Sequence, residues 1–156
     1  FCISLILPFI LKSQESNDSI KFKQQLNEVN INALRVGKKT PVSFTNISKE
    51  QISKRNLGQD LPYIISMSPS VVTTSDAGAG IGYTGFRIRG SDPTRINVTI
   101  NGIPLNDSES QGVWWVNMPD FSSSIDNIQI QRGVGTSTNG SGAFGLLSIF
   151  KQINLN

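Results

Sequence analysis

Short runs of alternating apolar and polar residues limit the fold of this chain more than any other feature. Residues 86–89 (FRIR) and 96–100 (INVTI) have the period of two that is typical of half-buried strands. The turn-forming residues 90–93 (GSDP) lie between the two runs. We therefore expect the two runs to pair as a β-hairpin.

Further strand and turn signals follow along the chain. Residues 101–102 (NG) are a strong turn signal, and residues 103–105 (IPL) continue from it. Residues 128–131 (IQIQ) repeat the alternation of a strand, and residues 119–124 fit a single helical turn. These elements predict a sheet whose strands are joined by long loops.

The first half of the folded region predicts short helices between strands. Residues 41–47 fit a strand, and Ser48 to Gln51 has the S-x-x-Q spacing of a capping box, so a helix is expected to begin at Ser48 and to end near Gly58. A second short helix is expected over residues 59–66, with Pro62 tolerated in its first turn.

Val71 and Val72 are expected to form a further brief strand. The expected fold class is therefore α+β, a small mixed β-sheet with short helices and long loops. Residues 41–145 form the expected domain, and six apolar strand residues are expected to share its core: Ile88, Ile96, Val98, Ile100, Ile128 and Ile130.

The N-terminal region differs in composition from this domain. Its first eleven residues (FCISLILPFIL) are apolar, but the run is too short to cross a bilayer as a helix, so residues 1–13 are interpreted as part of a secretory signal peptide. A buried N-terminal strand or helix is the alternative. Residues 14–40 form a polar leader that is expected to be flexible.

Composition excludes several classes of function. The chain has no His and a single Cys, Cys2, which excludes a Ser-His-Asp triad, a Cys-His pair and a His-ligated metal. The net charge is +3, and the Lys and Arg residues form no dense basic stripe, so nucleic acid is not an expected partner. A secreted enzyme would lack a candidate nucleophile and base, and no enzyme activity or cofactor is expected.

Two further patterns in the sequence do not predict a nucleotide or metal site. Residues 80–85 match G-x-G-x-x-G, but a strand pattern follows them instead of the helix that a dinucleotide needs. Nothing brings the acidic side chains of the second half together, and they lack the spacing of an EF-hand, so no metal site is expected. These side chains are Asp107, Glu109, Asp120 and Asp126.

Several segments occur in the order that is found in TonB-dependent outer-membrane receptors. The most specific are GFRIRG at 85–90, VTINGIPL at 98–105, IDNIQIQRG at 125–133 and GAFG at 142–145. The chain resembles the plug domain of that family, a domain that fills the lumen of a β-barrel, and the resemblance extends over residues 26–145.

The resemblance implies partners as well as a fold. An energy-coupling segment would add as a strand to a TonB-like periplasmic energy transducer. The alternative for this segment is a disordered leader. The residues expected to bind the transducer are Glu28, Val29, Asn30, Ile31, Asn32 and Ala33.

The resemblance also implies contacts with the barrel and with a solute. Three arginines, Arg87, Arg89 and Arg132, would face carboxylates on the barrel wall, although solvated strand arginines are the alternative. Loop residues would meet a small solute such as a metal chelate, unless their aromatic rings pack beneath the loops. These residues are Tyr83, Asn106, Asp107, Trp114 and Trp115.

The function implied is that of a gating module in an outer-membrane receptor, which takes up a ferric siderophore, cobalamin or a similar scarce solute. A stand-alone periplasmic interaction or signalling domain, and a non-functional truncated fragment, are the alternatives.

The last eleven residues, 146–156 (LLSIFKQINLN), depart from the family pattern, which continues as ASINLQTN. A shift of the reading frame after Gly145 can produce that continuation, so a frameshift is proposed, with a naturally short protein as the alternative. The segment is accordingly expected to pack poorly.

Overall fold

The computed structural model describes residues 35–37, 39–134 and 143–151. The predicted signal segment and the predicted transducer-binding residues Glu28 to Ala33 lie outside the described residues. Among the described residues, no helix is long and apolar enough to cross a membrane.

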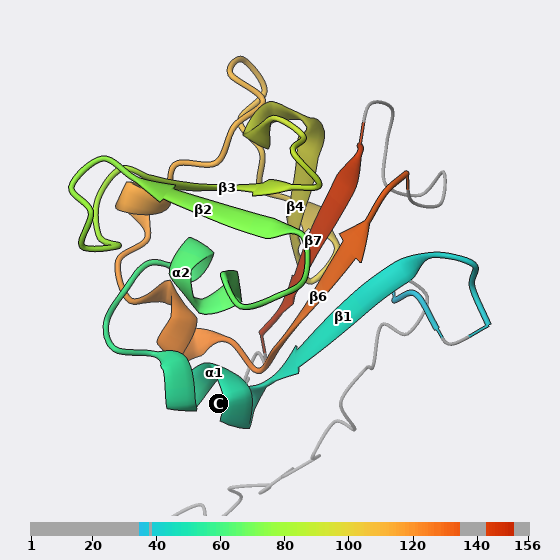
Figure 1. Ribbon diagram of the computed structural model, residues 1–156, viewed down its shortest axis with the longest axis horizontal. Helices are drawn as coiled ribbons and strands as arrows, with labels where there is room; N and C mark the ends of the chain where they lie inside the picture. The colour runs from blue at the N-terminus through green and yellow to red at the C-terminus, as the bar shows by residue number, and fades with distance from the viewer. Residues whose placement is uncertain (1–34, 38, 135–142, 152–156) are drawn as a thin grey trace, which may run out of the picture. The chain divides into compact units, whose positions relative to one another are not determined.

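A five-stranded mixed sheet forms the larger part of the fold (Figure 1). Its strand order is β1-β6-β7-β4-β5. The pair β4 and β7 is parallel, and the other neighbours are antiparallel. The strands are β1 (Ser43–Ser48), β4 (Ile96–Ile100), β5 (Ile103–Pro104), β6 (Asn127–Arg132) and β7 (Gly145–Phe150).

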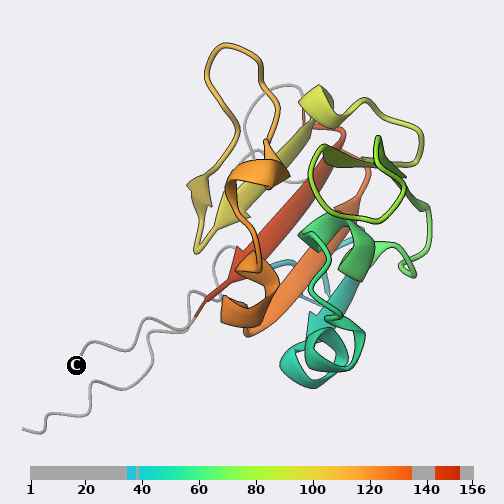
Figure 2. The same ribbon diagram turned by 90° about the vertical axis from the view of Figure 1, so that its left-hand side faces the viewer.

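A two-stranded hairpin, β2 (Val71–Ser75) and β3 (Thr84–Ile88), lies against one face of this sheet (Figures 1 and 2). The predicted pairing of residues 86–89 with residues 96–100 is therefore wrong. Arg89 has φ of 52° and starts a turn that continues into a 3₁₀-helix, η2 (Pro93–Arg95), so the chain leaves the plane of the hairpin. Each strand then finds another neighbour: β3 pairs with β2, and β4 lies between β7 and β5.

Two short helices follow β1 much as the sequence predicts. The first, α1 (Lys49–Arg55), begins after Ser48, whose backbone N–H donates to Gln51 Oε1 at 3.0 Å. The second, α2 (Leu61–Ile65), is shorter than predicted and carries its proline in the first turn. The 3₁₀-helices η3 (Trp115–Asn117) and η4 (Phe121–Ser124) complete the fold. The predicted α+β class is confirmed.

The hydrophobic core lies between the sheet, the hairpin and the two helices. Five of the six predicted core residues are buried, and Ile100 is partly buried against them. Side chains from α1, α2 and β2 join the same cluster, including Ile52, Ile64 and Val71. The alternation in the strands therefore identified the core even where it misjudged the strand pairing.

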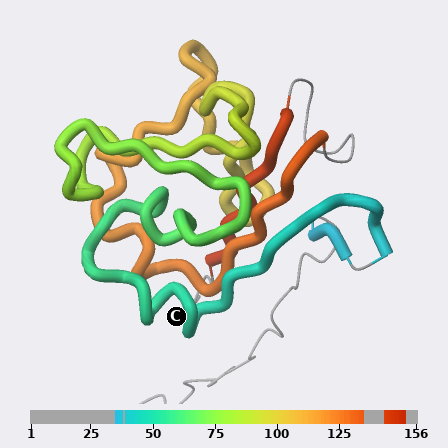
Figure 3. Tube along the Cα trace, viewed as in Figure 1, coloured from blue at the N-terminus to red at the C-terminus, as the bar shows by residue number. Residues whose placement is uncertain are grey.

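Strand β7 is the clearest departure from expectation. All six of its residues are buried, and it lies between β6 and β4 (Figure 3). Leu147 and Ile149 enter the core, and a Cβ on Gly145 would lie 3.3 Å from Ile88 Cδ1, so glycine permits a close approach there. The prediction that the segment from residue 146 packs poorly is wrong for residues 146–150, because a nearly continuous apolar run suits a central strand that is buried on both faces.

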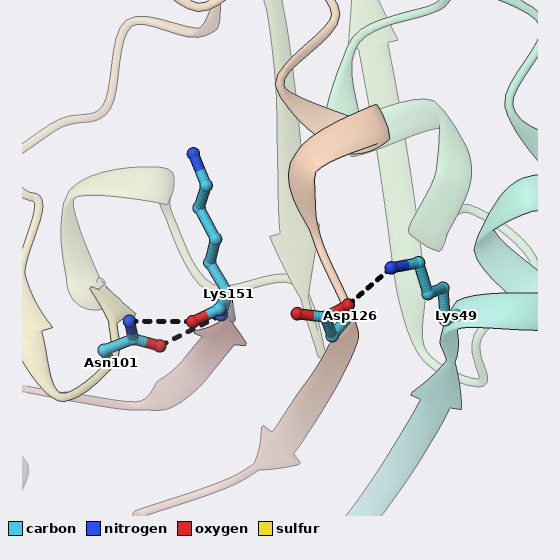
Figure 4. A network of polar contacts seen from close by, with 4 residues as sticks. All are labelled: Lys49, Asn101, Asp126 and Lys151. Carbon is cyan, nitrogen blue, oxygen red and sulfur yellow. Dashed lines mark hydrogen bonds and ion pairs between the residues drawn. The ribbon is translucent and has the colours of Figure 1, made fainter. Parts of the chain in front are cut away.

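Polar contacts fix the end of β7 (Figure 4). The side-chain amide of Asn101 donates to Lys151 O at 3.1 Å, and Lys151 N–H donates to Asn101 Oδ1 at 3.0 Å. Beside them, Asp126 N–H donates to Phe150 O, and the Asp126 carboxylate lies 2.7 Å from Lys49 Nζ. Asp126 therefore joins the start of β6 to α1.

Candidate functional site

Arg87 and Arg89 lie at the end of β3 that is far from its loop with β2. Arg87 is exposed and pairs only distantly with Asp92, with 3.9 Å between Nη2 and Oδ2. Arg89 is also exposed, and its backbone N–H donates to Ser70 O at 2.8 Å. Both guanidinium groups lie on the surface, where they are available to contact another molecule or another protein segment.

A third arginine that the sequence analysis did not identify extends this basic surface. Arg89, Arg95, Asp92 and Phe144 line an open pocket of about 530 Å³. The Arg95 guanidinium lies 5.6 Å from the centre of the Phe144 ring. The Thr94 backbone N–H, with its hydroxyl, lowers the pKa of Asp92, which keeps that carboxylate charged among the arginines. No strand or motif pattern marks Arg95, because it lies in the short 3₁₀-helix η2 between two strands.

Arg132 occupies a different environment from the other two predicted arginines. It lies on β6, and its guanidinium donates to Thr45 Oγ1 at 2.9 Å, Ser43 Oγ at 3.1 and 3.2 Å, and Pro69 O at 3.3 Å. These bonds join β6, β1 and the turn before β2. The structure thus gives Arg132 acceptors within the domain, and a contact of this residue with a barrel stays a prediction.

The two neighbouring tryptophans also lie in different environments. Trp115 is buried and packs on Phe86, with ring centroids 6.1 Å apart. Trp114 is 53% exposed and meets Tyr83, which is 62% exposed, edge to face at 6.4 Å with an interplanar angle of 84°. Packing beneath the loops therefore holds for Trp115, whereas Tyr83 and Trp114 form an exposed aromatic pair.

The loop that carries Tyr83, residues 76–83, is fixed to α2 and to the two residues before it, despite its glycines. Gly80 O accepts from Asp60 N–H at 2.9 Å, and Ala79 O accepts from the Gln59 side-chain amide at 3.2 Å. A Cβ on Gly80 would lie 2.9 Å from the ring of Tyr63, so this glycine lies directly against that ring. The exposed aromatic pair therefore rests on an anchored loop.

Asn106 and Asp107 hold their own loop together. The Asn106 side-chain amide accepts from Val98 N–H at 2.7 Å and donates to Ile96 O at 3.0 Å and Gln111 O at 2.8 Å. The Asp107 carboxylate accepts from Ser110 N–H at 2.7 Å and from its hydroxyl at 2.8 Å. These hydrogen bonds lower the pKa of Asp107, and the one from the Ser110 backbone N–H has the largest effect. Both residues thus shape the loop, and Asp107 remains exposed.

Within the described residues, His, Cys, Asp and Glu side chains do not gather in groups of three that could hold a metal ion. The arrangement instead offers two surfaces for contact. One is the basic surface of Arg87, Arg89 and Arg95, and the other is the pair of Tyr83 and Trp114.

The model of the TonB-dependent Receptor Plug Domain family matches residues 37–146 of this chain. Since this match covers most of the chain, the chain belongs to that family, whose members are parts of outer-membrane receptors. No curated protein matches the chain.

Solved structures of such receptors share the fold. The ferric enterobactin receptor PfeA of Pseudomonas aeruginosa (a G324V mutant) has 25% identity over 74% of this chain, with a TM-score of 0.56. The siderophore receptor PirA of Acinetobacter baumannii has 23% identity over 72% of this chain, also with a TM-score of 0.56. A double mutant of the Serratia marcescens hemophore receptor HasR has 20% identity over 73% of this chain, with a TM-score of 0.55. The chain spans 17–18% of the length of these receptors.

Proposed function

We propose that this chain is the plug and gating module of an outer-membrane receptor that actively takes up a scarce solute, such as a ferric siderophore or cobalamin. The module performs no chemistry of its own: it blocks and opens a path, and an energy transducer supplies the work. Membership of the plug family supports this proposal, together with the likeness to siderophore and hemophore receptors.

The observation that carries the proposal is the exposed pair of Tyr83 and Trp114 on an anchored loop. Large aromatic rings are usually buried, and two that meet edge to face in solvent provide a surface for the rings or apolar parts of a solute. The two loops that supply them, residues 76–83 and 106–116, contain Asp76, Asp107 and Glu109 but no Lys or Arg. Contact with the solute is therefore expected to come mainly from the rings.

The basic surface supports a second contact, with the wall of the receptor's own barrel. Exposed guanidinium groups bind carboxylates in a bidentate manner, and such pairs strengthen when they are shielded from water. We assign this contact first to Arg87 and Arg89. An N-terminal signal would export the chain, and the plug would then lie within the barrel in the outer membrane with its N-terminus toward the periplasm.

The energy transducer would bind the segment from Glu28 to Ala33 as an added strand, with main-chain hydrogen bonds that are largely independent of side chains. A titration of the whole chain with the periplasmic domain of a TonB-like transducer tests this. Replacing Val29 by Pro removes one amide donor and should weaken binding about tenfold. Asn17→Pro, outside the segment, is the control; equal weakening by both variants would place the binding segment elsewhere.

Solute contact is tested separately in a complete receptor that carries this plug. Trp114→Ala should weaken binding of the transported solute about tenfold, on the order of one buried aromatic contact. Trp114 is already exposed, so the change should leave folding intact. Unchanged affinity in Trp114→Ala and in Tyr83→Ala would exclude the aromatic pair as the contact surface. The coding sequence downstream supplies an independent check, since a barrel requires many amphipathic strands.

A further inference from the structure

The side chain of Asp60 is buried at the start of α2 but does not cap that helix. Asp60 occupies the N-cap position, where a side chain ordinarily accepts from the N–H group two or three residues further on. Here Pro62 has no N–H, and Tyr63 N–H donates to the main-chain oxygen of Asp60 at 3.0 Å. The carboxyl group makes no capping hydrogen bond and is 5% exposed, so it is available to another buried partner.

That partner is Thr84, the first residue of β3. The Thr84 hydroxyl donates to Asp60 Oδ2 at 2.8 Å, and Asp60 N–H donates to Gly80 O at 2.9 Å. Asp60 thus binds the chain on both sides of residues 81–83, the segment that carries Tyr83. We name Asp60, with its contacts to Gly80 and Thr84, the clasp.

Hydrogen bonds within the loop of residues 76–83 do not replace the clasp. Asp76 N–H donates to Tyr83 O at 3.1 Å, and Thr84 N–H donates to Gly82 O at 2.9 Å. Both bonds join the hairpin to itself, so they fix the internal shape of the loop. The place of the loop on α2 depends instead on contacts with the helix and with the residues just before it, and Asp60 supplies the buried carboxyl group among them.

The second ring of the aromatic pair is held by a different part of the core. Trp114 precedes Trp115, which is buried and packs on Phe86 of β3 with ring centroids 6.1 Å apart. The exposed rings of Tyr83 and Trp114 therefore meet only while each segment keeps its own attachment. Contact between two rings weakens when they separate by a fraction of their spacing, so a small displacement of the loop would disturb the pair.

We propose that Asp60 is a positioning residue that fixes Tyr83 beside Trp114, and with it the shape of the surface that a solute would contact. The proposal rests on the proposed function, because the aromatic pair is assigned to solute contact there. A buried carboxyl group is costly unless it is hydrogen-bonded, and displacement of the loop would remove its hydroxyl donor. This cost opposes displacement and favours one arrangement of the two rings.

NMR of the whole chain tests the clasp without a solute. Thr84→Val keeps the branched shape of the side chain and removes the hydroxyl, whereas Thr84→Ser keeps the hydroxyl. In Thr84→Val the Asp60 amide should exchange about fivefold faster, the effect of one net hydrogen bond, and the nuclear Overhauser effect between the Tyr83 and Trp114 rings should weaken. Thr84→Ser should resemble the unchanged chain. Thr74→Val alters an exposed threonine of β2 and is the matched control, which should change neither signal.

Variants of Asp60 test the other side of the same hydrogen bond. Asp60→Asn keeps an oxygen that can accept from the Thr84 hydroxyl and should keep the ring contact, whereas Asp60→Ala should weaken it as Thr84→Val does. Neither change removes a helix cap, because the side chain does not cap α2. An unchanged ring contact in both Thr84→Val and Asp60→Ala would overturn the proposal.

A complete receptor that carries this plug tests the consequence for a solute, with a ferric catecholate chelate, a ferric hydroxamate chelate and cobalamin as probes. For a probe that binds, Thr84→Val should weaken binding by less than the roughly tenfold expected for Trp114→Ala, and Thr84→Ser should not weaken it. Added to Trp114→Ala, Thr84→Val should cause no further loss, because both changes act on one ring contact.

The outcomes separate this proposal from the proposed function. Weaker binding in Trp114→Ala with unchanged binding in Thr84→Val would overturn the role of Asp60. Absence of binding of all three probes, or unchanged binding in Trp114→Ala, would instead contradict the proposed solute contact, and the NMR measurement would then decide by itself whether Asp60 fixes Tyr83.

Discussion

The five-stranded sheet and the β2–β3 hairpin use similar residues for different purposes. Arg132 of the sheet binds acceptors in β1 and before β2, whereas Arg87 of the hairpin is exposed and only distantly paired. Strand β7 is buried along its whole length, whereas β3 alternates between the core and solvent. The comparison teaches that the sheet holds the most completely buried strand, whereas the hairpin divides its side chains between the core and solvent, where Arg87 is free to make contacts.

The largest expected effect is in the sheet. Leu147 is fully buried in β7, and Leu147→Ala should reduce the free energy of unfolding by about 2–5 kcal/mol, through lost burial and the cavity that remains. Leu57→Ala is the control, because Leu57 is 83% exposed and its truncation should have little effect. Urea unfolding of both variants measures the difference. Equal midpoints would mean that burial of the Leu147 side chain in β7 contributes no stability.

The next effect compares two arginines. Arg132→Ala should cost about 2 kcal/mol because it removes several charge-assisted hydrogen bonds that join three parts of the domain. Arg87→Ala should cost less than about 0.5 kcal/mol, as is usual for an exposed, loosely paired charge. Thermal unfolding would measure both. A larger loss for Arg87 than for Arg132 would reverse the division between sheet and hairpin.

A smaller effect is expected in the loop that supports the aromatic pair. Gly80 and Gly78 both have positive φ, 78° and 75°, but only at Gly80 would a Cβ meet a neighbour, the Tyr63 ring. Each change to Ala should cost about 1 kcal/mol for the backbone conformation. Gly80→Ala should cost about 1 kcal/mol more for the overlap. Equal losses of stability would show that the loop does not rest on Tyr63.

The smallest effect concerns pH. Hydrogen bonds from Ser110 lower the pKa of Asp107 below the ordinary 3.8. A lowered pKa stabilises the loop above pH 3.8, and this contribution is lost as pH falls through the lowered value. The midpoint of the pH-dependent movement of the Ser110 amide signal, which NMR can follow, should therefore lie below 3.8. In Asp107→Asn that movement should disappear, and a midpoint above 3.8 in the unchanged chain would contradict the assignment.

Much of the fold was predictable because it depends on local patterns. The capping box at Ser48 and the alternation of Ile128 and Ile130 are short-range signals that packing reinforces. The pairing of β3 and β4 was mispredicted because a turn signal between two strands does not reveal which other strands compete for their edges. Strand β7 was mispredicted because departure from a family pattern was given more weight than the nearly continuous apolar run of residues 146–150.

The candidate site was less predictable from the sequence. Strand membership alone did not distinguish Arg132 from Arg87, because their difference depends on acceptors brought from β1 and from before β2. Trp114 and Trp115 are adjacent, so only the packing of Phe86 and Tyr83 separates the buried ring from the exposed one. In the sequence, Gln129 has the pattern of a polar residue in an alternating strand. No sequence signal shows that its hydrogen-bond partner is the main chain of Val36.

Residue-resolved hydrogen exchange of the unaltered chain tests the division between sheet and hairpin most directly. The account predicts that the Leu147 and Ile149 amides exchange only through global unfolding, as slowly as those of β6, because β7 is paired on both sides. Amides of the exposed loop residues 77–79 should exchange orders of magnitude faster. Exchange of the β7 amides at the rate of that loop would contradict the account, since β7 would then lie outside the stable sheet.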